Sequence, residues 1–260
     1  ELYYYSERKK PYLLLSFATK KNMYDVSKIC KRLFTREFGQ LNLEFCEMDI
    51  DPANKMLSMK DCSSTGKFSC EVVEILPNDD QRISKKGKDF KEYEANWRTL
   101  KPVEADWFSR PKVMSWDIEA YSHNKRCFPD KSHELDIVFS IAATFQVYGL
   151  PETLIMYVII MGDVDEARTK KTVLENVKST SNVDLPQDRV KIVYAKDELE
   201  VIFKFLEITE LEDPEVMIGY HIFGFDYDYL NERITSVGEE WPNFGRLKFE
   251  GCKMQNLSWK

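Results

Sequence analysis

The stretch PKVMSWDIEAYS, residues 111–122, places two carboxylates inside a segment that otherwise has the pattern of a buried β-strand. Successive side chains of a strand point to opposite faces, so we expect Asp117 and Glu119 on one face, close together. Two adjacent anions repel each other, and burial raises their pKa values unless a cation lies between them. Mg²⁺ and Mn²⁺ prefer carboxylate oxygens, so the pattern suggests a divalent metal site. An ordinary strand with a solvated acidic face has the same pattern and is the alternative.

The residues around this strand predict an α/β domain with a mixed sheet. Four further strands are predicted from apolar runs, at residues 134–148, 153–162, 189–195 and 215–220. Asp197 is the predicted N-cap of a helix, and Glu200 completes a capping box. Another helix is predicted to begin near Asp226. A meander of strands followed by helix, strand and helix is the element order of ribonuclease H-like nucleases, which carry helices on the faces of the sheet.

Residues 1–110 predict a smaller α+β domain and linker, followed by the α/β domain at 111–260. The predicted elements of the smaller domain are strands at 12–18, 41–50 and 67–76 and a helix at 23–38. This order suggests a ferredoxin-like sandwich, a class that includes RNA-recognition modules. The segment GKFSCEVV lacks the paired aromatics of a base-stacking strand, so a structural module and a nucleic-acid-binding module both remain open. Charged residues and prolines at 82–112 predict a connection that ends near Arg110.

Composition narrows the class of protein. The 260 residues are 43% hydrophobic and carry a net charge of −7, which disfavours binding of duplex nucleic acid by this chain alone. The longest apolar runs are far shorter than the roughly 20 residues of a membrane span, and no signal peptide opens the chain. Six cysteines without a CxxC pair predict free thiols in a reducing compartment, the nucleus or cytoplasm. The first residue is Glu1, so we expect a segment of a longer protein.

Two motifs identify a family resemblance. The DIE of residues 117–119 is followed about 110 residues later by GYHIFGFD, and together they resemble the first two exonuclease motifs of B-family DNA polymerases. CFPDKSHELDIVFSIA and the segment leading into GYHIFGFD are also similar to that family, over roughly residues 90–233. The segment MSWDIEAYS resembles the corresponding sequence in polymerases of large nucleocytoplasmic DNA viruses.

The resemblance implies a 3′–5′ proofreading exonuclease that hydrolyses single-stranded DNA 3′ ends with two Mg²⁺ or Mn²⁺ ions. Asp117 would bridge the ions, Glu119 would hold the ion that activates the attacking water, and Asp226 would hold the other. His221 stands where the family has asparagine in the second motif, and it would contact substrate or serve as a histidine without a catalytic part. Phe225 would stack on a base or pack the start of its helix into the core.

The resemblance is incomplete in two places. The third exonuclease motif, a tyrosine with an aspartate four residues later, is absent, since the chain ends 34 residues after Asp226. We therefore expect an incomplete metal site and little activity from this chain alone. The polymerase palm, fingers and thumb, the primer–template and a processivity factor are the implied partners, and no membrane is. A non-catalytic scaffold or template-binding module, and another ribonuclease H-like nuclease, are the alternatives.

Overall fold

The computed structural model describes residues 13–38, 45–85, 90–181 and 183–254. The chain divides into two compact units, which we call unit 1 (1–71 and 95–105) and unit 2 (72–94 and 106–260). The chain therefore passes between the units three times. The boundary near Arg110 that the sequence suggests stays a prediction.

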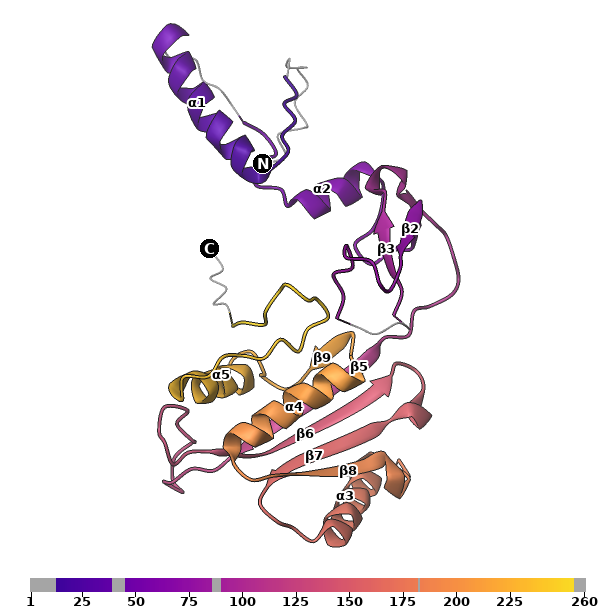
Figure 1. The fold of residues 1–260 in the computed structure, drawn as a ribbon, viewed down its shortest axis with the longest axis vertical. Helices are drawn as coiled ribbons and strands as arrows, with labels where there is room; N and C mark the ends of the chain where they lie inside the picture. The colour runs from indigo at the N-terminus through magenta and orange to yellow at the C-terminus, as the bar shows by residue number, and fades with distance from the viewer. Residues whose placement is uncertain (1–12, 39–44, 86–89, 182, 255–260) are drawn as a thin grey trace. The chain divides into compact units, whose positions relative to one another are not determined.

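A five-stranded mixed sheet forms the centre of unit 2, in the order β8-β7-β6-β5-β9 (Figure 1). The strands are β5 (Lys112–Ala120), β6 (Val138–Val147), β7 (Ile155–Met161), β8 (Val190–Ala195) and β9 (Val216–Ile218). β6 runs antiparallel to both β5 and β7, whereas β8 is parallel to β7 and β9 is parallel to β5. Parallel neighbours need a long crossover, and helices supply it here. The predicted strands and the mixed sheet are confirmed.

Three helices accompany the sheet: α3 (Glu166–Ser181), α4 (Glu198–Glu212) and α5 (Asp226–Ser236). α4 packs across β6, β7 and β8, and α3 lies along β8 (Figure 1). The predicted cap of α4 is confirmed, because the Asp197 carboxylate accepts a hydrogen bond from the Glu200 N–H (2.9 Å). The Glu200 carboxylate reaches back to the N–H of Lys196 (2.7 Å), one residue before the cap. The sequence did not predict α3, which has no buried residue to mark a core-facing stripe.

The core of unit 2 lies between one face of the sheet and helices α4 and α5. Met114, Trp116 and Ile118 of β5 are buried on that face. The ring centroid of Trp116 lies 4.8 Å from those of Phe205 on α4 and Tyr227 on α5. Because strand side chains alternate, the residues between these three on β5 lie on the opposite face.

Residues 72–94 contribute to unit 2 through β2 (Val72–Ile75) and β3 (Glu92–Ala95), which form a two-stranded sheet. Between them, Ser84 forms a β-bridge with Leu247. The N–H of Lys85 donates to the carbonyl of Arg246 (2.8 Å), which extends this contact between distant parts of the chain. The region predicted as a plain connection thus holds strands, including β4 of unit 1.

Unit 1 contains α1 (Lys20–Phe38), α2 (Pro52–Met59) and the paired strands β1 (Phe68–Ser69) and β4 (Lys101–Pro102). Asp51 caps α2 by accepting from the N–H groups of Ala53 and Asn54. Short 3₁₀ helices lie at Trp97–Thr99 here and at Pro151–Thr153 and Gln187–Arg189 in unit 2. The predicted helix at 23–38 is therefore confirmed as part of α1.

The three strands predicted for the first 110 residues differ from the structure. Residues 13–18 form no strand, and Leu13 and Leu14 are exposed without a covering layer. Residues 45–50 form bends that lead into α2, and the rest of the 41–50 prediction lies outside the described residues. The 67–76 run divides into β1 and β2, since the Glu71 N–H bonds to the Thr99 hydroxyl instead of a partner strand. The ferredoxin-like arrangement stays a prediction.

Two features bear on the class of protein. All six cysteines are free, as the sequence predicts. Among the residues that the structure describes, no helix combines the length and the apolar character that crossing a membrane requires.

Candidate active site

The two carboxylates of β5 lie on the exposed face of that strand. Asp117 pairs in register with Ala142 of β6 and Glu119 with Ser140, and both acidic residues are exposed. The register shifts directly after Glu119, which is a β-bulge. Bulges of this kind re-aim side chains and are frequent beside active sites. The alternation expected for Asp117 and Glu119 is therefore observed.

Asp226, the first residue of α5, is 1% exposed and lies at the edge of β5. Its Oδ1 accepts a hydrogen bond from the N–H of Ile118 (3.2 Å), the residue between the two carboxylates of β5. Burial raises the pKa of Asp226, and the negative charge of the hydrogen-bonded Asp117 raises it further against the opposing effect of the Ile118 N–H. Asp117 and Asp226 thus come together from positions 109 residues apart.

The position of Asp226 depends on where β9 ends. β9 pairs with β5 only as far as Ile218 opposite Ser115, which leaves the edge of β5 open from residue 116 onward. The chain then turns over this edge at Gly219, where an added Cβ would lie 2.7 Å from the Trp116 carbonyl oxygen. Only glycine permits so close an approach of two backbones. The turn at 219–225 therefore delivers the start of α5 to the open edge.

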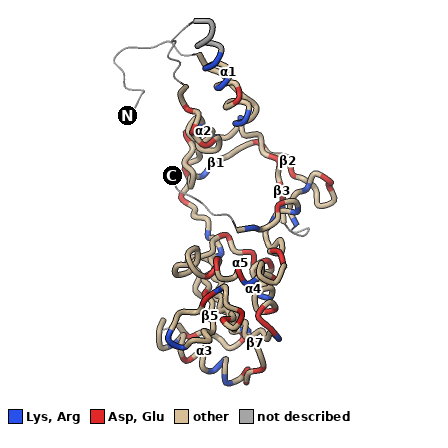
Figure 2. Tube along the Cα trace, turned by 90° about the vertical axis from the view of Figure 1, so that its left-hand side faces the viewer, with Lys and Arg blue, Asp and Glu red and all other residues tan. Residues whose placement is uncertain are grey.

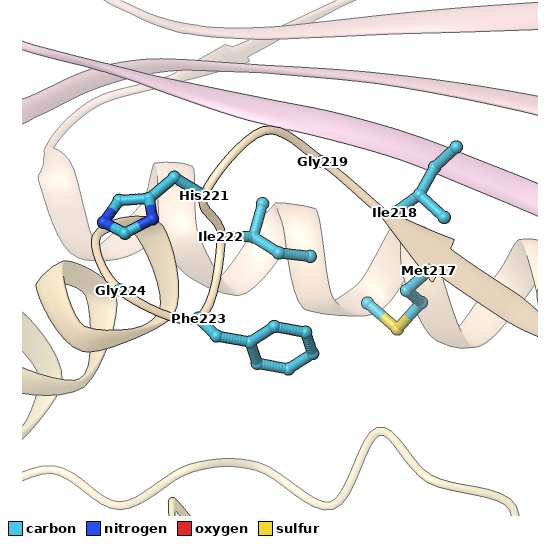
Figure 3. A pocket seen from close by; sticks show the side chains of 7 residues that line it. All are labelled: Met217, Ile218, Gly219, His221, Ile222, Phe223 and Gly224. Atoms are coloured by element: carbon cyan, nitrogen blue, oxygen red, sulfur yellow. The ribbon is translucent and has the colours of Figure 1, made fainter.

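His221 occupies this turn with a positive φ of 56°. Asparagine and histidine are among the non-glycine residues that adopt this left-handed conformation most readily, so a histidine fits a position where asparagine is expected. Its ring lies against Gly224, where an added Cβ would be 2.4 Å from Nε2. Figure 3 shows the ring of His221 folded back toward Gly224, while Phe223 extends away from it.

The same turn lines an open pocket of about 290 Å³, formed by residues 217–219 and 221–224. Phe225 is half-buried; its ring packs edge-on against Phe128 (ring centroids 6.0 Å apart) and at a tilt against Tyr229 (5.4 Å). Its contacts are those of a packing residue at the start of α5. On this turn, two aromatic side chains that the sequence did not single out are strongly exposed, Tyr220 at 94% and Phe223 at 82%. Their apolar surroundings in the sequence gave no signal of exposure.

The loop at 121–137 holds a second group of polar side chains that the sequence did not identify. His123, His133 and Asp136 each offer a ligand atom, and these atoms lie within 4.8 Å of one another. The available signal was that two of the three histidines of the chain fall within eleven residues. Arg233 of α5 holds this loop by donating to the carbonyl of His133 (2.9 Å). The guanidinium of Arg233 is itself held by an ion pair with Glu198 of α4 (2.7 Å).

The charges of the site favour a cation. The buried Asp226 and its neighbour Asp117 are unfavourable together when both are ionised, and a divalent ion removes that repulsion. Basic and acidic residues are interspersed along the rest of the trace (Figure 2). The donor set of carboxylate oxygens fits a hard ion such as Mg²⁺.

Known proteins match this chain over most of its length. The family model for the DNA polymerase family B exonuclease domain matches residues 44–258. DNA polymerase 037L of Invertebrate iridescent virus 6 is 24% identical over 98% of this chain and 20% of the relative. The DNA polymerase of Paramecium bursaria Chlorella virus NY2A is 28% identical over 62% of this chain and 16% of that protein.

The DNA polymerase delta catalytic subunit of Arabidopsis thaliana is 30% identical over 53% of this chain and 10% of the relative. The family B DNA polymerase of the archaeon Pyrobaculum calidifontis has a similar structure, with a TM-score of 0.47 and 21% identity over 74% of this chain and 18% of that one. The chain spans about a fifth or less of the length of these relatives. The resemblance predicted from the two acidic motifs is confirmed, since the family match covers well over half of the sequence: the chain belongs to the family of DNA polymerase family B exonuclease domains.

Proposed function

We propose that this chain is the 3′–5′ exonuclease region of a family B DNA polymerase, and that within the complete polymerase this region hydrolyses phosphodiesters at a single-stranded DNA 3′ end. The observation that carries the proposal is the meeting of Asp226 with Asp117 at the open edge of β5, beside the exposed Glu119. We infer a ribonuclease H-like fold for residues 111–260 and a ferredoxin-like relationship for residues 1–110. The partners are DNA, the palm, fingers and thumb of the same polymerase, and a processivity factor.

Asp117, Glu119 and Asp226 are the residues that would hold two Mg²⁺ or Mn²⁺ ions. Bound there, such ions supply Lewis acidity for the attacking water and for the charge that develops on the leaving 3′ oxygen. Asp117 and Glu119 offer their carboxylates on the solvent-facing side of β5. Oδ1 of Asp226 accepts a hydrogen bond from the Ile118 N–H, and Asp117 lies near enough to raise the pKa of Asp226.

The turn at 219–225 and its exposed aromatic residues are the surface that we propose for the DNA strand end. The side chains of Tyr220 and Phe223 are strongly exposed, and Phe223 lines the pocket; aromatic rings of this kind stack on bases without sequence preference. His221 lies on the same turn and offers ring nitrogens for a hydrogen bond to the strand. Phe225, by contrast, supports α5 by packing.

The test is made in the complete polymerase with a 5′-labelled single-stranded oligonucleotide and a separate primer-extension assay. Asp117→Asn with Glu119→Gln should reduce 3′–5′ degradation at least about 100-fold, because direct ligands matter more than the outer ligands, whose loss costs about 10–100-fold. DNA synthesis should change less than about two-fold, since no synthesis residue lies on β5. Asp228→Asn is the matched control, because Asp228 lies on the same helix as Asp226 but pairs with Lys131.

Two results contradict the proposal. Unchanged degradation in the Asp117→Asn, Glu119→Gln variant would make the carboxylates a solvated face, as in a scaffold or template-binding module. An equal loss of degradation and synthesis would assign the pair a structural part.

A further inference from the structure

Three side chains that are not part of the site above gather at one end of the sheet. Asp136 lies two residues before the start of β6, and His123 and His133 lie in the loop that joins β5 to β6. One ligand atom from each lies within 4.8 Å of the other two. Two imidazoles and a carboxylate are a frequent ligand set for Zn²⁺ in proteins.

The carboxylate of this group is rigidly held. Asp136 is 1% exposed, and its two oxygens accept hydrogen bonds from the N–H groups of His123 and Asp130, both at 2.8 Å. The hydroxyl of Tyr229 donates to the carbonyl of Asp136 (2.8 Å), which ties its backbone to α5. Metal-binding carboxylates are held by such outer hydrogen bonds, which orient the oxygen toward the ion.

The histidines stand at the surface above this carboxylate. Nδ1 of His123 lies 2.6 Å and Nδ1 of His133 lies 3.7 Å from the same oxygen of Asp136. Nδ1 of His133 accepts the N–H of Leu135 (3.2 Å), so binding of an ion by this nitrogen requires that it exchange this hydrogen bond for the ion. The side chains of both histidines are about two-fifths exposed, and their rings are stacked 3.8 Å apart.

A common ion requires a small adjustment of these rings. Nitrogen and oxygen ligands bind Zn²⁺ at about 2.0–2.1 Å. Stacked rings direct their lone pairs in parallel, so one imidazole must swing for both to meet a single ion. Exposure on the solvent side permits this rotation, while Asp136 stays fixed below. Imidazole nitrogens favour Zn²⁺ over the harder Mg²⁺, which distinguishes this group from the carboxylates of β5.

We propose that His123, His133 and Asp136 form a site for one Zn²⁺ ion, with water completing its coordination. The ion would join the two ends of the 121–137 loop, since His123 lies four residues after Glu119 and His133 is fixed to α5 through Arg233. The 121–137 loop follows β5, which carries Asp117 and Glu119, and it contacts α5, which begins with Asp226. The ion would therefore stabilise a loop that contacts both elements of the acidic site.

The site is tested by dialysing the EDTA-treated chain against Zn²⁺ and measuring bound metal, and by the visible ligand-field absorption of Co²⁺ as a spectroscopic substitute. We expect one Zn²⁺ per chain in an Asp117→Asn background, which weakens the acidic site. His123→Ala and His133→Ala should each lower Zn²⁺ affinity at least about 100-fold and remove the Co²⁺ absorption. Both side chains are partly exposed, so these variants should fold, as circular dichroism would verify.

The third histidine provides the matched control. His221→Asn suits the positive φ of that residue and should leave Zn²⁺ binding unchanged. Zn²⁺ binding that survives the double variant His123→Ala, His133→Ala, or that falls equally with His221→Asn, would overturn the site. Absence of stoichiometric binding would also do so and would leave the proposed exonuclease untouched, because that test uses other residues.

Discussion

Replacement of Gly219 by alanine tests the turn that brings Asp226 to β5. An added Cβ would lie 2.2 Å from Cγ2 of Ile222 and 2.7 Å from the carbonyl oxygen of Trp116. Both distances are too short for non-bonded atoms, and the oxygen belongs to the backbone of β5, which cannot shift without disturbing its pairing with β6. Alanine is thus opposed by sterics alone, because Gly219 does not have a positive φ.

The expected loss of stability follows from two opposing effects. Forcing an extra methyl group into a packed site costs about 1–3 kcal/mol. Replacing glycine by alanine also restricts the unfolded chain, which returns about 0.4–1 kcal/mol. We therefore expect a net loss of roughly 1–2 kcal/mol for Gly219→Ala, or a decrease in Tm of about 2–8 °C for a unit of this size.

Urea denaturation followed by tryptophan fluorescence measures this loss, since Trp116 lies in direct contact with the turn. Gly251→Ala is the matched control, because no heavy atom lies within 4 Å of its added Cβ, and its stability should stay within about 0.5 kcal/mol of the unchanged chain. Mg²⁺ should raise the Tm of the unchanged chain, because a ligand that binds only the native state stabilises it, and Gly219→Ala should weaken this rise, since Asp226 moves away from Asp117. A Gly219→Ala variant as stable as Gly251→Ala, with a full Mg²⁺ response, would refute this account of the turn.

Three other changes test interactions around the site. Arg233→Met removes the cationic partner of the Glu198 carboxylate and should lower the free energy of unfolding, measured by urea denaturation, by roughly 3–5 kcal/mol. Lys171→Met removes an exposed ion pair on α3 and is the control, with an expected loss of less than about 0.5 kcal/mol. Burial favours the neutral form of Asp136, but hydrogen bonds from Asp130 and His123 outweigh this effect and hold the pKa of Asp136 at about 2. The stability of the chain should therefore fall as the pH decreases from about 4 to 2, and Asp136→Asn should make this fall smaller. The pKa of Asp226 is raised, so at pH values above the ordinary pKa of an aspartate the ionised Asp226 opposes folding. Asp226→Asn should therefore increase the Tm of the EDTA-treated chain at pH 7, and it should abolish the response of the Tm to Mg²⁺.

The second half of the chain was predictable because its local signals agree with its tertiary environment. Strands β5 to β8 carry β-branched and aromatic runs, and the Asp197 cap marks the start of α4. The same alternation that buries Trp116 exposes Asp117, so the face of the carboxylates followed from the sequence. In the first half, the apolar run at 67–76 predicts one continuous strand, but tertiary contacts such as that of the Glu71 N–H with the Thr99 hydroxyl divide it.

The histidine group could not be predicted in the same way. His123 and His133 are ten residues apart in a loop, and loop geometry is set by tertiary contacts such as those of Arg233 rather than by a periodic pattern. The convergence of Asp226 with Asp117 was expected from the family motifs, whereas its physical cause became visible only in the register. Because β9 stops opposite Ser115, a backbone N–H at the edge of β5 needs a partner.

That requirement gives Asp226 a structural part in addition to the proposed catalytic one. Its carboxylate is buried and satisfies the Ile118 N–H, so the turn and α5 depend on it even without metal. Asp117 and Glu119 are exposed and fill no space in the core. A protein of this fold that had lost nuclease activity would therefore retain an acceptor at residue 226 for stability, while residues 117 and 119 would be free to change. Loss of degradation without loss of stability in Asp117→Asn, Glu119→Gln is consequently the more decisive test of catalysis than any substitution of Asp226.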